Sequence, residues 1–341
     1  MSRFSRIMAV TLCIVSLADL FLVRIARIVG LEHQFLIVIL CGPLLLPQAY
    51  AKWRHLDRIS AAITCVQWIL LSQAALMPFM VAAGRSPAPL ADQALAHVDS
   101  LMHFSTPAVV RFIRSFPTLI QLSQLAYASA NYMIVLALVA PALAGNKRDS
   151  ERFVLSGTIA TILTAALFAL LPAIGPWTGS AFVPDPVQAD IEKSILLVKS
   201  ANEFRLGTGI SAIVTFPSFH VIVALVCGIS LWGFKRLRPI TGTITAAICI
   251  SVITTGWHYA TDVIGGVAVV LLSDFITGRW LLPEIHANFG SKTTSSAGTG
   301  SSGSAALFQA LSPPSMTAAG IPLAASSRAT FIAVASRRQV Q

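Results

Sequence analysis

Two histidines and an aspartate stand out in this sequence because ionisable side chains are scarce in the apolar stretch around them. The segment Phe216-Pro217-Ser218-Phe219-His220 holds the first histidine, and His258 and Asp262 follow later in the same stretch. His258 and Asp262 are four residues apart, so on a helix they lie on one face. A carboxylate in that place accepts the Nδ1 proton, fixes the tautomer and leaves Nε2 free as a nucleophile or a ligand.

An arginine and two helix N-termini complete a set of groups suited to a phosphate. Arg205 precedes the first histidine, and its guanidinium fork matches phosphate oxygens. Residues 217–220 and 258–262 are expected in the first turns of two helices that begin on the same side, where free N–H groups favour an anion. One histidine would attack phosphorus while the other protonates the leaving oxygen, with no metal needed.

Other functions remain open on these residues alone. Two histidines can ligate a metal, but Asp262 is the only nearby third ligand, and this spacing is a weak metal signature. The same polar groups also occur in the ion paths of transporters and in structural clusters inside membranes. No Gly-rich nucleotide loop is present, so we expect neither a metal nor a cofactor.

The composition indicates that membrane helices position these residues. The 341 residues are 55% hydrophobic and 11% charged, whereas a soluble domain carries about 25% charged residues. The net charge of +10 is not gathered on a soluble domain, so anchoring at the cytoplasmic side explains it better than nucleic acid does. The five cysteines lie in apolar runs without CxxC spacing, which argues against a disulfide framework or a zinc site.

The apolar runs predict an all-α polytopic membrane bundle of about eight transmembrane helices. A span needs about 20 apolar residues. The runs are residues 7–29, 34–51, 59–83, 119–144, 153–172, 210–233, 240–255 and 259–278.

With eight spans, the basic clusters all fall on one side of the membrane. These clusters are Arg3 and Arg6; Lys52, Arg54 and Arg58; Lys147, Arg148 and Arg152; Lys235, Arg236 and Arg238; and Arg279. The positive-inside rule makes this side cytoplasmic, with both termini, and places loops 84–118 and 173–209 outside together with both histidines. We expect a plasma (inner) membrane protein in the lipid bilayer. The sequence gives no indication of an oligomeric state.

Two polar patterns outside the central stretch need an interpretation. Leu95, Val98, Leu101 and Met102 recur at helical spacing with Asp92, His97 and Asp99 between them. This pattern predicts a short amphipathic helix at the outer interface, with the polar residues solvated. The first span carries Asp19, Arg24 and Arg27; we expect the arginines to reach the interface and Asp19 to pair with a neighbour, with a role in substrate access as the alternative.

The chain divides into three parts. Residues 1–83 form N-terminal transmembrane helices, and residues 84–282 form the catalytic membrane domain. Residues 283–341, rich in Ser, Ala, Gly and Thr, are expected to be a disordered cytoplasmic tail.

At the central stretch the sequence resembles the type-2 phosphatidic acid phosphatase superfamily. Pro217-Ser218-Phe219-His220 is similar to that family's PSGH motif, and residues 258–266, HYATDVIGG, are similar to its H-x-x-x-D-V-x-x-G motif. The nearer resemblance is to the branch that includes inositol phosphorylceramide synthases, where the motifs read F-P-S-x-H and H-Y-x-x-D. The resemblance covers residues 85 to 275 and implies a six-helix phosphatase-type core.

The resemblance assigns roles to the matching residues. It implies that His258 is the nucleophile that forms a phosphohistidine, that Asp262 orients it, and that His220 is the general acid. It also implies that Arg205, Ser218 and the backbone at Phe219 hold phosphate oxygens. The protein would then be a lipid-phosphate phosphatase or phosphotransferase acting on a phospholipid, isoprenoid phosphate or sphingolipid phosphate, the alternative being a non-catalytic transporter or scaffold.

Three departures from the family pattern qualify these roles. The K-x6-R-P motif is reduced to Arg205, with Lys199 one residue out of register. Phe219 replaces the glycine of PSGH and narrows the pocket if its side chain points inward. Val252 replaces an arginine. These changes favour phosphotransfer over simple hydrolysis.

Overall fold

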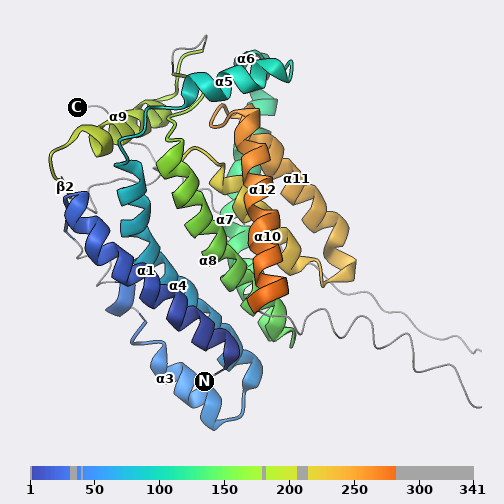
Figure 1. The fold of residues 1–341 in the computed structure, drawn as a ribbon. Coiled ribbons are helices and arrows are strands. Elements are labelled where there is room, and N and C mark those ends of the chain that lie inside the picture. The colour runs from blue at the N-terminus through green and yellow to red at the C-terminus, as the bar shows by residue number, and fades with distance from the viewer. Residues whose placement is uncertain (1, 31–36, 40, 179–181, 206–213, 282–341) are drawn as a thin grey trace, which may run out of the picture. The chain divides into compact units, whose positions relative to one another are not determined.

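The computed structural model describes residues 2–30, 37–39, 41–178, 182–205 and 214–281, and is mostly helical (Figure 1). The predicted tail, residues 283–341, lies outside the described residues. In chain order the elements are α1 (Arg3–Ile25), β1 (Ile28–Val29), α3 (Leu45–Trp53), α4 (Asp57–Gly84), α5 (Asp92–Leu101), α6 (Thr106–Arg114), α7 (Pro117–Leu143), α8 (Lys147–Leu170), α9 (Pro186–Ser200), β2 (Phe204–Arg205), α10 (Phe219–Leu231), η1 (Lys235–Leu237), α11 (Arg238–Thr254), α12 (Ala260–Ile276) and η2 (Thr277–Leu281).

Six helical segments of the described chain are long and apolar enough to cross a membrane. They are α1, α4, α7, α8, η1 with α11, and α12 with η2. Their lengths of 20 to 28 residues match the thickness of a bilayer core. The chain is therefore a helical protein of the membrane class that the composition predicts.

Two of the eight expected spans differ from the prediction. Within residues 34–51, of which 34–36 and 40 lie outside the described chain, residues 37–39 are helical and α3 then runs for nine residues from Leu45; Pro43 lies between them and has no N–H to continue a helix. Within residues 210–233 the helix α10 begins at Phe219 and has 13 residues, directly after Pro217; residues 210–213 lie outside the described chain. A helix of thirteen residues extends only about 20 Å, which is shorter than the bilayer core of about 30 Å.

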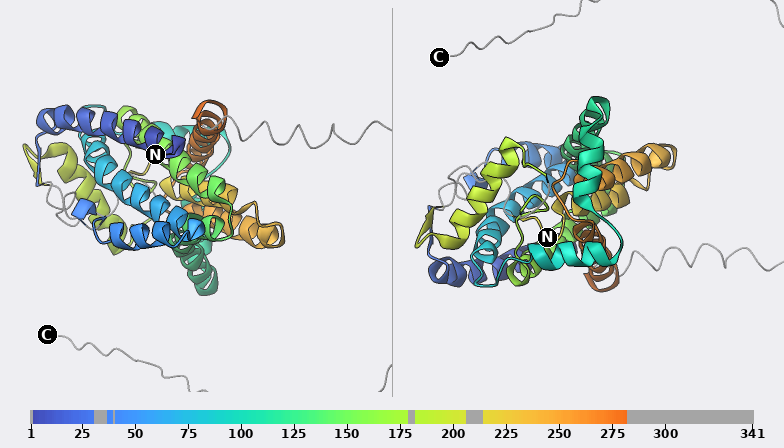
Figure 2. Two further views of the ribbon diagram at one scale, coloured as in Figure 1. Left: turned by 90° about the horizontal axis from the view of Figure 1, so that it is seen from below. Right: turned by 90° about the horizontal axis from the view of Figure 1, so that it is seen from above.

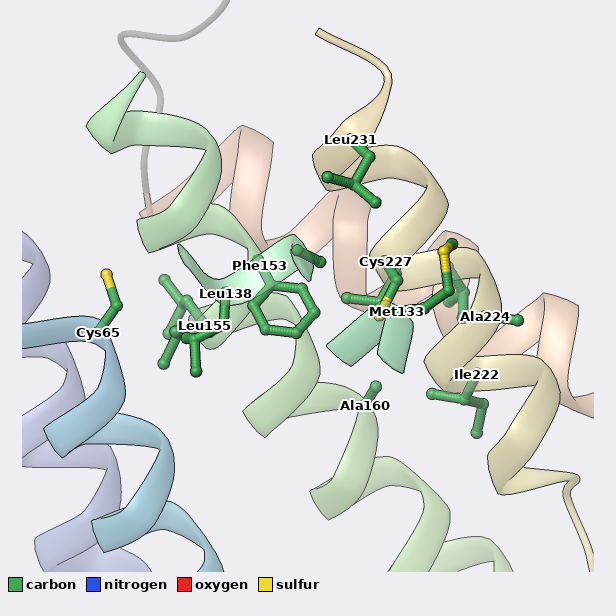
Figure 3. Close-up of a cluster of buried hydrophobic side chains, with 14 of the residues drawn as sticks. Cys65, Met133, Leu138, Phe153, Leu155, Ala160, Ile222, Ala224, Cys227 and Leu231 are labelled. Atoms are coloured by element: carbon green, nitrogen blue, oxygen red, sulfur yellow. The ribbon is translucent and has the colours of Figure 1, made fainter. Parts of the chain in front are cut away.

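Helix α8 is at the centre of the packing, in contact with α4, α7, α10 and α12. Its buried face carries small residues such as Ala160, Thr164 and Ala165, which let neighbouring backbones approach closely. Larger side chains, including Phe153 and Leu155, fill the remaining space in the main core (Figure 3).

Hydroxyl groups join these helices inside the apolar core. Ser72 Oγ of α4 lies 3.2 Å from Thr158 Oγ1 of α8, and Ser156 Oγ of α8 lies 3.2 Å from Ser273 Oγ of α12. Ser72, Thr158 and Ser273 also donate to backbone carbonyls of their own helices, so the contacts between helices add to hydroxyls that are already satisfied. These contacts fix α8 relative to the helices on both sides.

The basic clusters meet at one end of the bundle, here called the basic end. Arg58 donates to the Leu143 carbonyl (3.5 Å), and Arg152 Nε donates to Asp274 Oδ1 (2.8 Å). Helices α5, α6 and α9 lie across the opposite end, here called the site end (Figure 2, right).

A two-stranded parallel sheet pairs Val29 of β1 with Arg205 of β2.

We predict that Leu155→Ala lowers the free energy of unfolding by about 2–5 kcal/mol, because Leu155 is fully buried in the main core. Thermal unfolding in detergent measures the change. Leu125→Ala on α7, where the side chain is 67% exposed, is the matched control and should unfold close to the parent. Equal shifts for the two variants would contradict this packing.

Candidate active site

His258 and Asp262 form a buried pair at the site end. His258 Nδ1 lies 3.1 Å from Asp262 Oδ2, which also accepts the Tyr259 backbone N–H at 2.9 Å. Asp262 is in the first turn of α12, and His258 comes two residues before that helix begins. A carboxylate accepts the Nδ1 proton and so leaves the Nε2 lone pair free. The predicted pairing is therefore present in the structure.

A tight turn between α11 and α12 presents His258. The Val252 carbonyl accepts the N–H groups of Trp257 (3.2 Å) and His258 (3.1 Å). Gly256 has φ +83°, a conformation that favours glycine. Gln188 of α9, fully buried, donates to the carbonyls of Thr255 (3.3 Å) and Gly256 (3.2 Å). Helix α9 thus holds the turn from the other side.

Burial lowers the pKa of His258 to about 4, and a hydrogen bond with the Thr215 backbone opposes part of this change. Removing an imidazolium from water is costly, so the neutral ring is favoured. At neutral pH the imidazole is then uncharged. A neutral imidazole with Nδ1–H directed at a carboxylate has the form that a nucleophile requires.

His220 faces the same cavity as His258. The cavity has a volume of about 450 Å³, and both histidines line it. His220 is in the first turn of α10 and stacks on Tyr127 of α7, with ring centroids 3.9 Å apart and an interplanar angle of 25°. The stacking holds the imidazole in one plane. The two histidines, far apart in sequence, thus open on one space, as the motifs predict.

Ser218 and Phe219 lie where α10 begins. The Ser218 N–H donates to the Asp262 carbonyl at 3.1 Å, which joins the two motifs directly. Ser218 Oγ is buried and has no hydrogen-bond partner among the described residues. Ser218 is not among the residues that line the histidine cavity, so its role in phosphate binding stays a prediction. Phe219 lines the histidine cavity and so narrows it, as expected for a phenylalanine in place of glycine. The first N–H groups of α10 face no helical acceptor and favour an anion.

Arg205 is not among the described residues that line the cavity. It is exposed on β2, opposite Val29, so its predicted role in phosphate binding stays a prediction. Lys199 donates to the carbonyls of Ser86 and Ala88 at 2.9 and 3.0 Å. These bonds give Lys199 a role in joining α9 to the loop after α4.

Helix α5 forms where the sequence predicts an amphipathic helix and buries Leu95, but two of the three polar residues expected to be solvated are buried instead. Asp92 and Asp99 are buried at 8% and 3% exposure, whereas Leu101 is 66% exposed. Of the three polar residues expected on a solvated face, only His97 is exposed. Asp92 and Asp99 are buried because their carboxylates accept hydrogen bonds from buried backbone N–H groups, which need acceptors.

Asp99 caps the helix that carries Asp262. It accepts the N–H groups of Ala260 (3.0 Å) and Thr261 (2.9 Å), and the Thr261 and Thr106 hydroxyls also donate to it. Asp92 accepts the N–H groups of Ile174 and Gly175. The two carboxylates satisfy the free amides of a helix N-terminus and of a loop.

Sequence reasoning missed this arrangement of Asp92, Asp99 and Gln188, although one signal was available. Asp92, Leu95 and Asp99 have the i, i+3, i+7 spacing of a single helix face, and all three are buried. Gln188 stands at the capping-box position of α9, where its Oε1 accepts the Asp185 N–H at 2.9 Å. Its contacts with the carbonyls of Thr255 and Gly256 gave no signal, since these residues are far along the chain.

A family model described as the PAP2 superfamily matches residues 93–276, more than half of the chain. The chain belongs to the PAP2 superfamily. No curated protein and no solved structure matches it. The superfamily comprises phosphoric-ester hydrolases and transferases that act on lipid phosphates in membranes.

The match begins inside α5 and ends with α12, so α1 to α4 lie outside it. Helix α4 nevertheless contributes Gln73, Leu76, Met77 and Met80 to the wall of the histidine cavity. Part of the site of this PAP2 protein is therefore built by a helix that the family model does not include.

We predict that Asp99→Ala destabilises the protein by about 2 kcal/mol or more, because it removes a helix cap and leaves two amides and two hydroxyls without their acceptor. Thermal unfolding measures the loss. Asp190→Ala on α9 is the control, since Asp190 is a surface residue paired only with Lys193, and exposed pairs contribute little. An Asp99→Ala protein as stable as the Asp190→Ala protein would contradict the cap.

Stability should also depend on the charge of His258. The folded pKa of about 4 is below the unfolded value of about 6.5, so the unfolded chain binds more protons between these pH values. The free energy of unfolding then falls as the pH drops from 6.5 to 4, by about 3 kcal/mol in total.

Thermal unfolding of the parent and of His258→Gln between pH 7 and 4.5 tests this dependence. The parent should lose more stability than His258→Gln over this range, and His97→Gln should behave as the parent does. Parallel curves for the parent and His258→Gln would show that His258 is not a buried neutral base.

Proposed function

We propose that this protein is a membrane enzyme that acts on the phosphate ester or diphosphate of a lipid through a phosphohistidine on His258. The observation that carries the proposal is the shared cavity. His258, held by Asp262, and His220 both line one space of about 450 Å³. Membership of the PAP2 superfamily supports phosphoric-ester chemistry at this site.

In the first step, Nε2 of neutral His258 attacks phosphorus and forms a P–N bond. The bond between phosphorus and the leaving oxygen breaks, and His220 donates a proton to that oxygen; the negative charge of the bound phosphate favours the imidazolium form that this step needs. Asp262 accepts the Nδ1 hydrogen bond and stabilises the positive charge that develops on the imidazole. The amides at the start of α10 and Ser218 Oγ hold the phosphoryl oxygens, with Arg205 as the predicted cation.

In the second step, His220 is neutral and takes a proton from water or from an acceptor hydroxyl. The oxygen attacks phosphorus, the P–N bond breaks, and His258 returns to its starting state. Water gives hydrolysis, and a lipid or polyol hydroxyl gives transfer of the phospho-headgroup. The motif departures favour transfer, as in the inositol phosphorylceramide synthase-like branch.

The cavity wall supports an amphiphilic substrate. Leu76, Met77 and Met80 of α4, with Val187 and Ile191 of α9, line the space beside the histidines. These side chains suit a hydrocarbon tail, and Met adapts to chains of different shape. We propose a phospholipid, isoprenoid phosphate or sphingolipid phosphate whose phosphate lies at His258 and whose tail lies along α4.

We further propose that the site end faces the extracytoplasmic side of a plasma membrane. The basic clusters gather at the opposite end, and lysine and arginine are enriched on the cytoplasmic side of membrane proteins. Both termini would then be cytoplasmic.

Substitution of each histidine tests the mechanism. Purified protein in nanodiscs is assayed with phosphatidic acid, an isoprenyl diphosphate and a phosphosphingolipid, each with and without an added lipid alcohol. We expect His258→Ala to lose about a thousandfold or more in rate and His220→Ala to lose about 10²–10⁴-fold, while His97→Ala stays at the parent rate. If His258→Ala keeps the parent rate, the mechanism is wrong; if the parent is inactive on every lipid, a transporter or scaffold becomes the better account.

Cysteine labelling tests the sidedness. Val183 at the site end is 79% exposed, and Leu237 at the basic end is 41% exposed. In a cysteine-free background, Val183→Cys should react with an impermeant maleimide in intact cells, and Leu237→Cys only after permeabilisation. The reverse pattern would place the site on the cytoplasmic side.

A further inference from the structure

A second cavity of about 690 Å³ lies between α1 and α4, apart from the histidine cavity. Leu71, Ala74, Ala75 and Pro78 of α4 line it, whereas Gln73, Leu76, Met77 and Met80 line the histidine cavity. At 100° per residue these two sets lie on opposite faces of α4. Helix α4 therefore separates two cavities, and the second lies outside the segment that matches the superfamily.

Asp19 of α1 lines this second cavity, and one oxygen of its carboxyl group has no hydrogen-bond partner among the described residues. Its side chain is 9% exposed, and its Oδ1 atom is inaccessible and accepts no hydrogen bond from the described residues. The sequence-based expectation that Asp19 pairs with a neighbour is therefore not met in the described chain. An unpartnered buried carboxyl group is costly, and inside a membrane it indicates a binding role.

A backbone carbonyl at the cavity wall also lacks the donor that a regular helix would give it. Pro78 in α4 has no N–H to give to the Ala74 carbonyl four residues earlier, and both residues line the cavity. A proline inside a membrane helix is tolerated where another group satisfies the freed carbonyl. The cavity thus combines two acceptors with a wall that is otherwise mainly apolar.

The surroundings restrict the chemistry of an occupant. Exposed residues of α1, such as Leu17, Leu20 and Phe21, are 62–67% accessible, so this part of the helix faces lipid hydrocarbon in the membrane. The polar lining includes Ser16, Asp19 and Arg24, with the thiol of Cys13 and the indole of Trp68, whose N–H donates to Ser5 Oγ at 3.3 Å. The carboxyl group of Asp19 disfavours a phosphate beside it, and the positive charge of Arg24 disfavours an ammonium group.

We propose that the cavity between α1 and α4 binds a long-chain lipid alcohol whose hydroxyl donates to Asp19 and whose chain lies along Leu12, Leu71 and Ala75. The site is reached from the lipid and does not depend on the chemistry of His258. A neutral hydroxyl satisfies the carboxyl group at the smallest cost of desolvation.

Photolabelling of the full-length protein in nanodiscs tests the proposal. The probe is a 16-carbon alcohol with a diazirine in mid-chain, and the matched control probe is its methyl ether. Mass spectrometry locates the labelled peptides. We expect the alcohol to label residues 9–24 and 68–78 about fivefold more than the ether does, as the loss of one hydrogen bond implies.

Variants at the cavity decide whether Asp19 is responsible. Asp19→Leu should reduce labelling by the alcohol to the level of the ether, and Asp19→Asn, which keeps an acceptor, should retain most of it. Ala75→Trp fills the space and should abolish labelling there even if Asp19→Leu fails to fold. His258→Ala should label as the parent does, which separates this site from the proposed reaction.

Equal labelling by the alcohol and the ether, or unchanged labelling in folded Asp19→Leu, would overturn the proposal. Labelling confined to peptides of the histidine cavity would overturn it as well. Loss of labelling in His258→Ala would assign the probe to the reaction site instead.

Discussion

The hydrogen bond between Asp262 and His258 is the contact on which the rest of the site depends, because both groups are buried and neither has another side-chain partner among the described residues. This hydrogen bond can form only if the start of α12 is fixed relative to the turn that carries His258. Asp99 fixes that helix start, and Gln188 fixes the turn at Gly256. The site is thus assembled by three elements, α5, α9 and α12, that each supply a buried polar contact.

The sequence predicts the histidine pair well because a four-residue spacing and a motif are local properties. His220 and His258 meet at one cavity since both motifs begin helices at the same end, which the apolar runs and basic clusters also predict. The orientation of α5 could not be predicted from hydrophobicity, since Asp99 is buried by hydrogen bonds to Ala260 and Thr261, which are distant in sequence. Six of the eight predicted spans are long apolar helices of the described residues, whereas α3 and α10 are shorter than the apolar runs that contain them, and parts of those two runs lie outside the described chain.

Helix α4 links the family core to the part of the chain that lies outside it. One face lines the histidine cavity, and the opposite face lines the cavity that holds Asp19. Contacts such as Ser72 with Thr158 tie the helix to α8, so its two faces are held at a fixed position relative to the core. The family motifs locate the two histidines, but part of the cavity that they line is formed by a helix that carries no motif.

The most direct test of the central claim is to trap the covalent intermediate. Protein mixed with a ³²P-labelled lipid phosphate is quenched in alkali, which preserves phosphohistidine, and the labelled peptide is identified by mass spectrometry. The account predicts label on His258, its loss in His258→Ala, and its accumulation in His220→Ala if a substrate with a good leaving group is used, because release of the phosphoryl group then lacks its base. Label on another residue, or turnover by an active parent without any acid-labile, alkali-stable phosphoenzyme, would contradict it.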